Sequence, residues 1–97
     1  MNISFPNPIE YGYTIYIKNG CIFCERVKQL LSNIYPQPKY IDCDSFLVFN
    51  KNRFLNFIKT LTGGIEHKTF PIVFLNKYYI GGYTETKAFI DEALKYR

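Results

Sequence analysis

The stretch Tyr13-Thr-Ile-Tyr-Ile-Lys-Asn-Gly-Cys-Ile-Phe-Cys24 contains the features on which the fold depends. Residues 13–18 are dominated by β-branched and aromatic side chains and stop at a turn dipeptide, Asn19-Gly20, which predicts a first strand. After Cys24 the apolar residues recur at the i, i+3, i+4, i+7 spacing of an amphipathic helix, which ends before two prolines; they are Val27, Leu30, Leu31 and Ile34. Cys21 and Cys24 are therefore expected where a strand turns into a helix.

The remaining elements follow from the same patterns. Residues 39–42 predict a second strand, and Asp44 or Ser45 is expected to cap a second helix that ends at Thr62-Gly-Gly64. Residues 72–75 and 78–80, separated by Asn76-Lys77, predict an antiparallel hairpin, and Gly81-Gly82 leads into a last helix. The inward residues expected are Phe54, Phe57, Ile58 and Leu61 in the second helix and Phe89, Ile90, Ala93 and Leu94 in the last.

The order β-α-β-α-β-β-α predicts an α/β fold with one four-stranded mixed sheet covered by helices on both faces. The 97 residues suffice for one domain, residues 1–97, in which residues 1–12 form an extended N-terminal arm.

The net charge of +4 comes from basic residues that are scattered along the chain, unlike the dense basic stripe of a nucleic-acid binder. Without a membrane span or a signal-peptide pattern, we expect a cytoplasmic monomer that binds neither nucleic acid nor membrane.

The Cys-x-x-Cys pair predicts redox chemistry, because a thiolate attacks disulfides and the start of a helix favours a negatively charged sulfur. Cys21 is expected to be the nucleophile, helped by the positive charge of Lys18. Cys24, one helical turn further in, is expected to be more buried and to act as the resolving thiol.

Zinc binding is the competing use of such a pair, but the other candidate ligands, Cys43 and His67, match no zinc spacing, so no metal is expected. We interpret Cys43 as a buried apolar residue and His67 as a solvated loop residue.

Thr69-Phe70-Pro71 precedes the hairpin and has two interpretations. Proline is tolerated at the start of an edge strand. The alternative is a cis peptide bond that presents the backbone of Phe70 to an extended substrate.

Three separated motifs, Cys-x-x-Cys, Thr-Phe-Pro and Gly81-Gly-Tyr-Thr-Glu85, make residues 13–96 resemble the glutaredoxins, which have the thioredoxin fold. The resemblance implies glutathione as co-substrate. The residues that it places in the glutathione site are Lys18, Phe23, Phe70, Pro71, Gly82, Thr84 and Glu85.

Some of these residues also have simpler interpretations. Lys18 is a candidate solvated charge, Thr84 a candidate N-cap and Glu85 a first-turn acid that complements the helix dipole. The chain also departs from the family, because Ile22 replaces the usual proline after the first cysteine and Phe23 replaces the usual tyrosine.

The resemblance implies a glutathione-disulfide oxidoreductase acting on glutathionylated or disulfide-containing proteins, and leaves open whether ribonucleotide reductase is among them. Two alternatives stay open. One is a dimer that holds an iron–sulfur cluster with glutathione, although the large Ile22 disfavours it; the other is a thioredoxin-like reductant served by a flavoprotein.

Overall fold

The central sheet is mixed, as the sequence predicts, with its strands in the order β2-β1-β3-β4. They are β1 (Tyr13–Ile17), β2 (Lys39–Asp42), β3 (Ile72–Leu75) and β4 (Tyr78–Gly81). β1 and β2 pair in parallel, whereas β3 is antiparallel to both β1 and β4. This computed structural model describes residues 4–95, so residues 1–3 of the predicted arm and Tyr96, the last residue of the resemblance, lie outside it.

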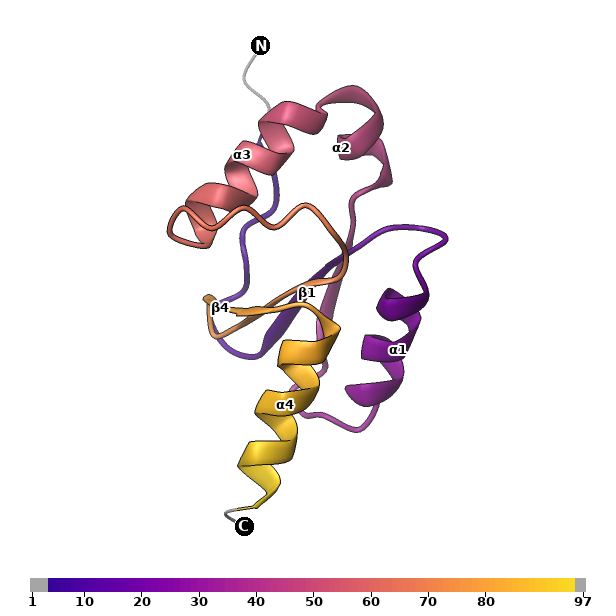
Figure 1. Ribbon diagram of the computed structural model, residues 1–97, viewed down its shortest axis with the longest axis vertical. Coiled ribbons are helices and arrows are strands. Elements are labelled where there is room, and N and C mark those ends of the chain that lie inside the picture. The colour runs from indigo at the N-terminus through magenta and orange to yellow at the C-terminus, as the bar shows by residue number, and fades with distance from the viewer. Residues whose placement is uncertain (1–3, 96–97) are drawn as a thin grey trace.

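Helices cover both faces of the sheet: α1 (Ile22–Leu30) and α4 (Tyr83–Leu94) lie together on one side, α2 (Asp44–Phe49) and α3 (Lys51–Leu61) on the other (Figure 1). Successive side chains of β1 point to opposite faces of the sheet and pack in the clusters on the two sides. Ile15 packs with Val27 in one apolar cluster, and Tyr16 packs with Phe54 in the other. No helix within residues 4–95 is both long and apolar enough to cross a membrane.

The predicted second helix is in fact two helices, which is a correction. The chain breaks at Asn50, where φ is −145° and ψ is 40°, and Asn50 is the N-cap of α3. The expectation that Asp44 or Ser45 caps the first of them is also wrong, because Cys43 occupies that position. The Asp42 carboxylate instead accepts the N–H of Asp44 at 2.9 Å and satisfies one free donor of the first turn.

The predicted inward face of α4 is only partly correct. Thr86 is fully buried and Ile90 is half-buried, but Phe89, Ala93 and Leu94 are exposed. In Figure 1 the C-terminal part of α4 runs away from the sheet, so only its first turns meet the core.

The segment that leads into β1 packs against the domain. Phe5 places its ring 5.1 Å from that of Phe46 and 5.3 Å from that of Phe54. The hydroxyl of the buried Tyr16 donates a hydrogen bond to the carbonyl of Pro6 at 2.6 Å. These contacts join the segment to the cluster beneath α3.

Candidate functional site

Cys21 is the N-cap of α1, with extended backbone angles (φ −112°, ψ 106°). Its Sγ accepts the backbone N–H of Cys24 at 3.1 Å and is joined to the Cys24 sulfur in a disulfide. The sulfur therefore takes the place that a serine or aspartate oxygen usually holds at a helix start. Gly20, with φ of 66°, makes the turn from β1 into this cap.

The two cysteines differ in exposure as the sequence predicts. Cys24 is 1% exposed within the cluster beneath α3, whereas Cys21 is only half-buried. The turn ahead of them is anchored from α2, since the Asp44 carboxylate accepts the N–H of Asn19 at 3.0 Å. Cys21 is thus the sulfur that an external disulfide can approach.

The loop before β3 meets the cysteine pair. The Phe70–Pro71 bond is cis, as the second interpretation of Thr-Phe-Pro predicts, and the carbonyl oxygen of Phe70 lies 3.4 Å from Cys21 Sγ. The Phe70 ring stacks on Phe54 with 6.5 Å between centroids. The ammonium of Lys18 lies 5.7 Å from the centre of the Phe70 ring, a cation–π arrangement.

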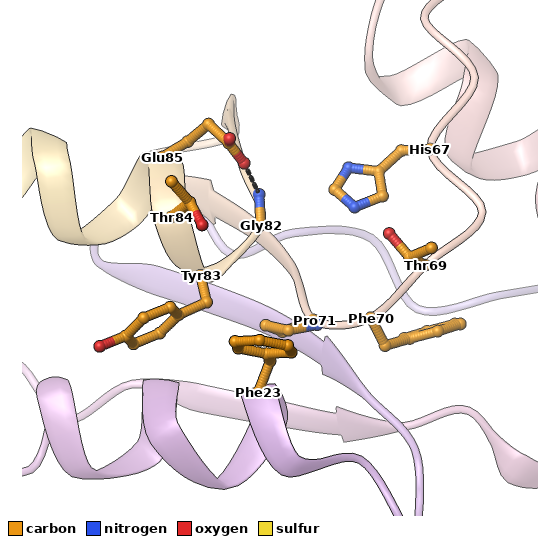
Figure 2. Close-up of a pocket in the computed structure, with 9 residues that line it drawn as sticks. All are labelled: Phe23, His67, Thr69, Phe70, Pro71, Gly82, Tyr83, Thr84 and Glu85. Carbon is orange, nitrogen blue, oxygen red and sulfur yellow. Dashed lines mark hydrogen bonds between the residues drawn. The ribbon is translucent and has the colours of Figure 1, made fainter.

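A pocket of about 330 Å³ opens between this loop, α1 and the start of α4 (Figure 2). It brings together six of the seven residues predicted to contact glutathione; Lys18 is the exception and does not line it. Its lining consists of Phe23, His67, Thr69, Phe70, Pro71, Gly82, Tyr83, Thr84 and Glu85.

The start of α4 forms one wall of the pocket. The N-cap is Gly82, so the interpretation of Thr84 as N-cap is wrong. Oε1 of Glu85 accepts the N–H of Gly82 at 2.7 Å, which confirms that this acid stabilises the helix start. Gly81, at φ of +136°, leaves room for the Glu85 side chain, because a Cβ there would lie 2.7 Å from Glu85 Cβ.

Sequence reasoning missed three lining residues: His67, Thr69 and Tyr83. Tyr83 lies against Phe23, with 5.8 Å between ring centres, and so extends the aromatic wall above α1. The motif around Gly81 contains Tyr83, and Thr69 precedes Phe70, so position within the recognised motifs was a usable signal for both.

His67 is half-buried, so the expectation of a solvated histidine is wrong. Its Nδ1 is hydrogen-bonded to the hydroxyl of Tyr79. Burial lowers the pKa of His67 below its usual value, and the charge of Glu85 opposes this change.

Cys43 is fully buried with a free thiol, as the sequence predicts. Burial raises its pKa to about 12, and the nearby carboxylate of Asp42 adds to this. Within residues 4–95, no group of three or more His, Cys, Asp or Glu side chains is placed to hold a metal ion.

Comparison with solved structures identifies the fold. The dithiolic glutaredoxin 2-C-Grx1 of Trypanosoma brucei brucei superimposes with a TM-score of 0.70 at 20% identity, over 86% of this chain and 80% of that one. A buckwheat glutaredoxin–glutathione complex gives 0.69 at 22% identity, over 84% and 70%. Reduced Escherichia coli glutaredoxin gives 0.65 at 28% identity, over 86% and 96%. The predicted thioredoxin fold is confirmed.

Comparison of sequences identifies the family. The mitochondrial glutaredoxin-2 of Pongo abelii is 32% identical over 72 residues, which are 74% of this chain and 42% of that protein. The chain thus spans less than half the length of this relative. The family model of the glutaredoxins matches residues 13–80, which include the cysteine pair, the Thr-Phe-Pro loop, all of β3 and all but the last residue of β4. The chain therefore belongs to the glutaredoxin family.

Proposed function

We propose that the protein is a glutathione-dependent thiol–disulfide oxidoreductase that reduces protein–glutathione mixed disulfides and protein disulfides. The observation that carries the proposal is the position of Cys21, whose half-exposed sulfur caps α1 beside a pocket and forms a disulfide with the buried Cys24. Family membership and the glutathione complex of the buckwheat relative also support it.

The reaction begins with Cys21 as a thiolate. The N–H of Cys24 and the positive end of the α1 dipole stabilise negative charge on its sulfur, which lowers the free energy of the thiolate relative to the thiol. This thiolate attacks the glutathione sulfur of a mixed disulfide. A bond forms between Cys21 and glutathione, the substrate's disulfide breaks, and the protein thiol leaves with a proton from solvent.

Two routes then regenerate Cys21. In the first, the thiolate of a second glutathione attacks the mixed disulfide, which yields oxidised glutathione and free Cys21. In the second, used for protein disulfides, Cys24 attacks the sulfur of Cys21, releases the substrate thiol and closes the Cys21–Cys24 disulfide. Two molecules of glutathione then reduce that disulfide.

The same pocket is proposed to hold glutathione. The backbone of Phe70, next to Cys21, pairs with the cysteine of glutathione, and Phe23 packs against the bound peptide. Thr84 and Glu85 receive its γ-glutamyl end at the start of α4. Lys18 attracts a carboxylate from outside the pocket.

The different roles proposed for the two cysteines, Cys21 as nucleophile and Cys24 as resolving thiol, provide the test. Cys21→Ser should abolish activity, because a serine hydroxyl is not ionised near neutral pH and cannot replace the thiolate. Cys24→Ser should keep deglutathionylation, in which glutathione resolves the intermediate, and should lose reduction of protein disulfides. Both variants are assayed on one glutathionylated protein and one protein disulfide, with NADPH and glutathione reductase.

Cys43→Ser is the matched control and should leave both rates nearly unchanged. Wild-type turnover with thioredoxin reductase but none with glutathione would contradict the proposal. So would deglutathionylation by Cys21→Ser at the wild-type rate.

A further inference from the structure

His67 occupies the pocket wall that faces the start of α4. It comes from the loop between α3 and β3, and its ring lies between Thr69 and Gly82 (Figure 2). A Cβ built on Gly82 would be 3.7 Å from Cε1 of His67, which shows how closely the imidazole approaches α4. A ligand in the pocket must pass within reach of this ring.

Tyr79 determines which nitrogen of His67 is available. The hydroxyl of Tyr79 has Nδ1 of His67 as its hydrogen-bond partner within the described residues, and a phenol donates more readily than it accepts toward a neutral imidazole. When the hydroxyl donates, Nδ1 carries no proton and Nε2 carries one. In Figure 2 the second ring nitrogen lies on the side of Phe70 and Pro71, inside the pocket. The available group is therefore an N–H donor.

The charges around the pocket indicate which ligand group would accept a hydrogen bond from this N–H. The first-turn N–H groups of α4 have no partners within the helix and attract an anion, whereas the carboxylate of Glu85 attracts a cation. A ligand that carries a carboxylate and an ammonium on one carbon satisfies both. In glutathione only the γ-glutamyl end has that pair, since the glycine end is a lone carboxylate.

We propose that Nε2–H of His67 binds the α-carboxylate of the γ-glutamyl residue of glutathione, opposite the start of α4. Tyr79 is a positioning residue, because its hydroxyl keeps the proton on Nε2. This inference rests on the proposed function, since it assigns a further ligand contact within the same pocket. The contact also gives the otherwise unassigned histidine a role in distinguishing glutathione from peptides without a γ-glutamyl group.

The test measures the equilibrium between Cys21 and oxidised glutathione in the full-length Cys24→Ser protein. One thiol of the protein forms a mixed disulfide and one reduced glutathione is released, and mass spectrometry gives the ratio of the two protein forms. We expect His67→Leu to lower the equilibrium constant about tenfold, the usual scale for a hydrogen bond to a charged group. His67→Gln, whose amide can donate near the position of Nε2, should keep most of the affinity. Tyr79→Phe should lower the equilibrium constant about threefold.

Two analogues identify the carboxylate. With γ-aminobutyryl-cysteinyl-glycine disulfide, which lacks the α-carboxylate, the His67→Leu variant and its parent should give equal constants. With the glycine ethyl ester of glutathione, the tenfold difference should remain. Circular dichroism and thermal unfolding of each variant check that the fold is kept.

An equal loss with all three ligands, or no loss with glutathione, would overturn the assignment of His67 and leave the proposed function intact. A Cys24→Ser parent that forms no mixed disulfide with glutathione but forms one with hydroxyethyl disulfide would overturn both. If His67→Leu fails to fold, the comparison of Tyr79→Phe with its parent decides the matter, because its threefold difference should remain with the glycine ester and vanish with the analogue that lacks the α-carboxylate.

Discussion

Cys43 is chemically isolated from the pair at Cys21 and Cys24. Its thiol is fully buried at the start of α2, with Sγ 3.4 Å from the carbonyl oxygen of Ile41. Because burial raises its pKa to about 12, almost no thiolate exists at neutral pH. We predict that iodoacetamide at pH 7.5 labels Cys21 in the reduced, folded protein and leaves Cys43 unmodified until urea unfolds the chain.

Peptide mass spectrometry after labelling with and without urea checks this prediction. The Cys43→Ser variant serves as the control for site assignment. Rapid labelling of Cys43 under native conditions would show that the α2 start opens far more readily than its burial indicates.

His67 should make the stability of the fold depend on pH. Burial lowers its folded-state pKa below the ordinary 6.5, so at pH values between the two pKa values the unfolded chain binds more protons than the folded one. The free energy of unfolding therefore falls as the pH drops below about 6.5, and this fall ends below the folded-state pKa. His67→Gln, which has no titrating ring, should lose less stability than wild type between pH 7.5 and 5.5.

Urea unfolding at pH 7.5, 6.5 and 5.5 at constant ionic strength measures the effect. His67 is the chain's single histidine, so the comparison with His67→Gln isolates it from the carboxylates. Parallel pH profiles for the two proteins would mean that the imidazole is equally solvated in both states.

At the scale of elements, the start of α4 depends on Gly81. Its φ of +136° disfavours any other residue, and an added Cβ would overlap the Glu85 side chain that accepts the N–H of Gly82. We predict that Gly81→Ala destabilises the protein by at least about 1 kcal/mol and displaces the Glu85 carboxylate from the helix start. Urea unfolding and the amide resonance of Gly82 report the two effects.

Gly64→Ala is the matched control, because Gly64 also has positive φ, +102°, but has open space where a Cβ would be placed. Gly64→Ala should lower the free energy of unfolding by less than Gly81→Ala does, and it should leave the amide resonance of Gly82 unchanged. Equal costs for the two variants would show that backbone conformation alone, without the steric overlap, limits Gly81.

The elements that the sequence predicts well are those whose pattern is local. The β-branched and aromatic run of β1 and the Asn76-Lys77 turn each depend on neighbours within one element, and the structure confirms both. The apolar stripe of α1 is confirmed only in part, because the helix ends at Leu30 and the predicted positions Leu31 and Ile34 lie beyond it. The break at Asn50 was not predictable in this way, because the apolar stripe of α3 continues from the helix before it without a proline or glycine between them. The outward-facing Phe89 escaped prediction because periodicity gives the face of a helix but not how much of its length meets the sheet.

The same distinction between local patterns and contacts across the fold applies to the residues of the candidate site. Phe23, Phe70 and Thr84 lie within recognised motifs, and their convergence follows from the fold. His67 was missed because its burial depends on Tyr79, which lies twelve residues further along the chain on β4. A contact between two elements leaves no periodic signal in either.

At the scale of the whole molecule, the N-terminal segment contributes to the core. The ring of Phe5 lies within 5.4 Å of those of Phe46, Phe54 and Phe57, measured between ring centres. We predict that Phe5→Ala lowers the free energy of unfolding by roughly 1–3 kcal/mol, less than for a fully buried phenylalanine because Phe5 is half-buried. Urea denaturation followed by circular dichroism measures this loss.

Tyr11→Ala is the control, because Tyr11 belongs to the same segment but is 79% exposed. Its effect should be within about 0.5 kcal/mol of zero. If Phe5→Ala changed the free energy of unfolding as little as Tyr11→Ala, the packing of this segment would not contribute to the stability of the fold.

The core has two apolar clusters, one on each face of the sheet, and the backbone of β1 and β3 runs between them. Val27 in one cluster and Ile58 in the other lie on opposite faces of the sheet, so the costs of substituting them should combine nearly additively, whereas Ile17 packs against both clusters. In evolutionary terms the two faces can drift largely separately, because most side chains beneath α3 have their neighbours on that side. Cys24 is the exception, because it belongs to α1 but packs in the cluster beneath α3, so any rebuilding of that layer must still leave room for the cysteine pair.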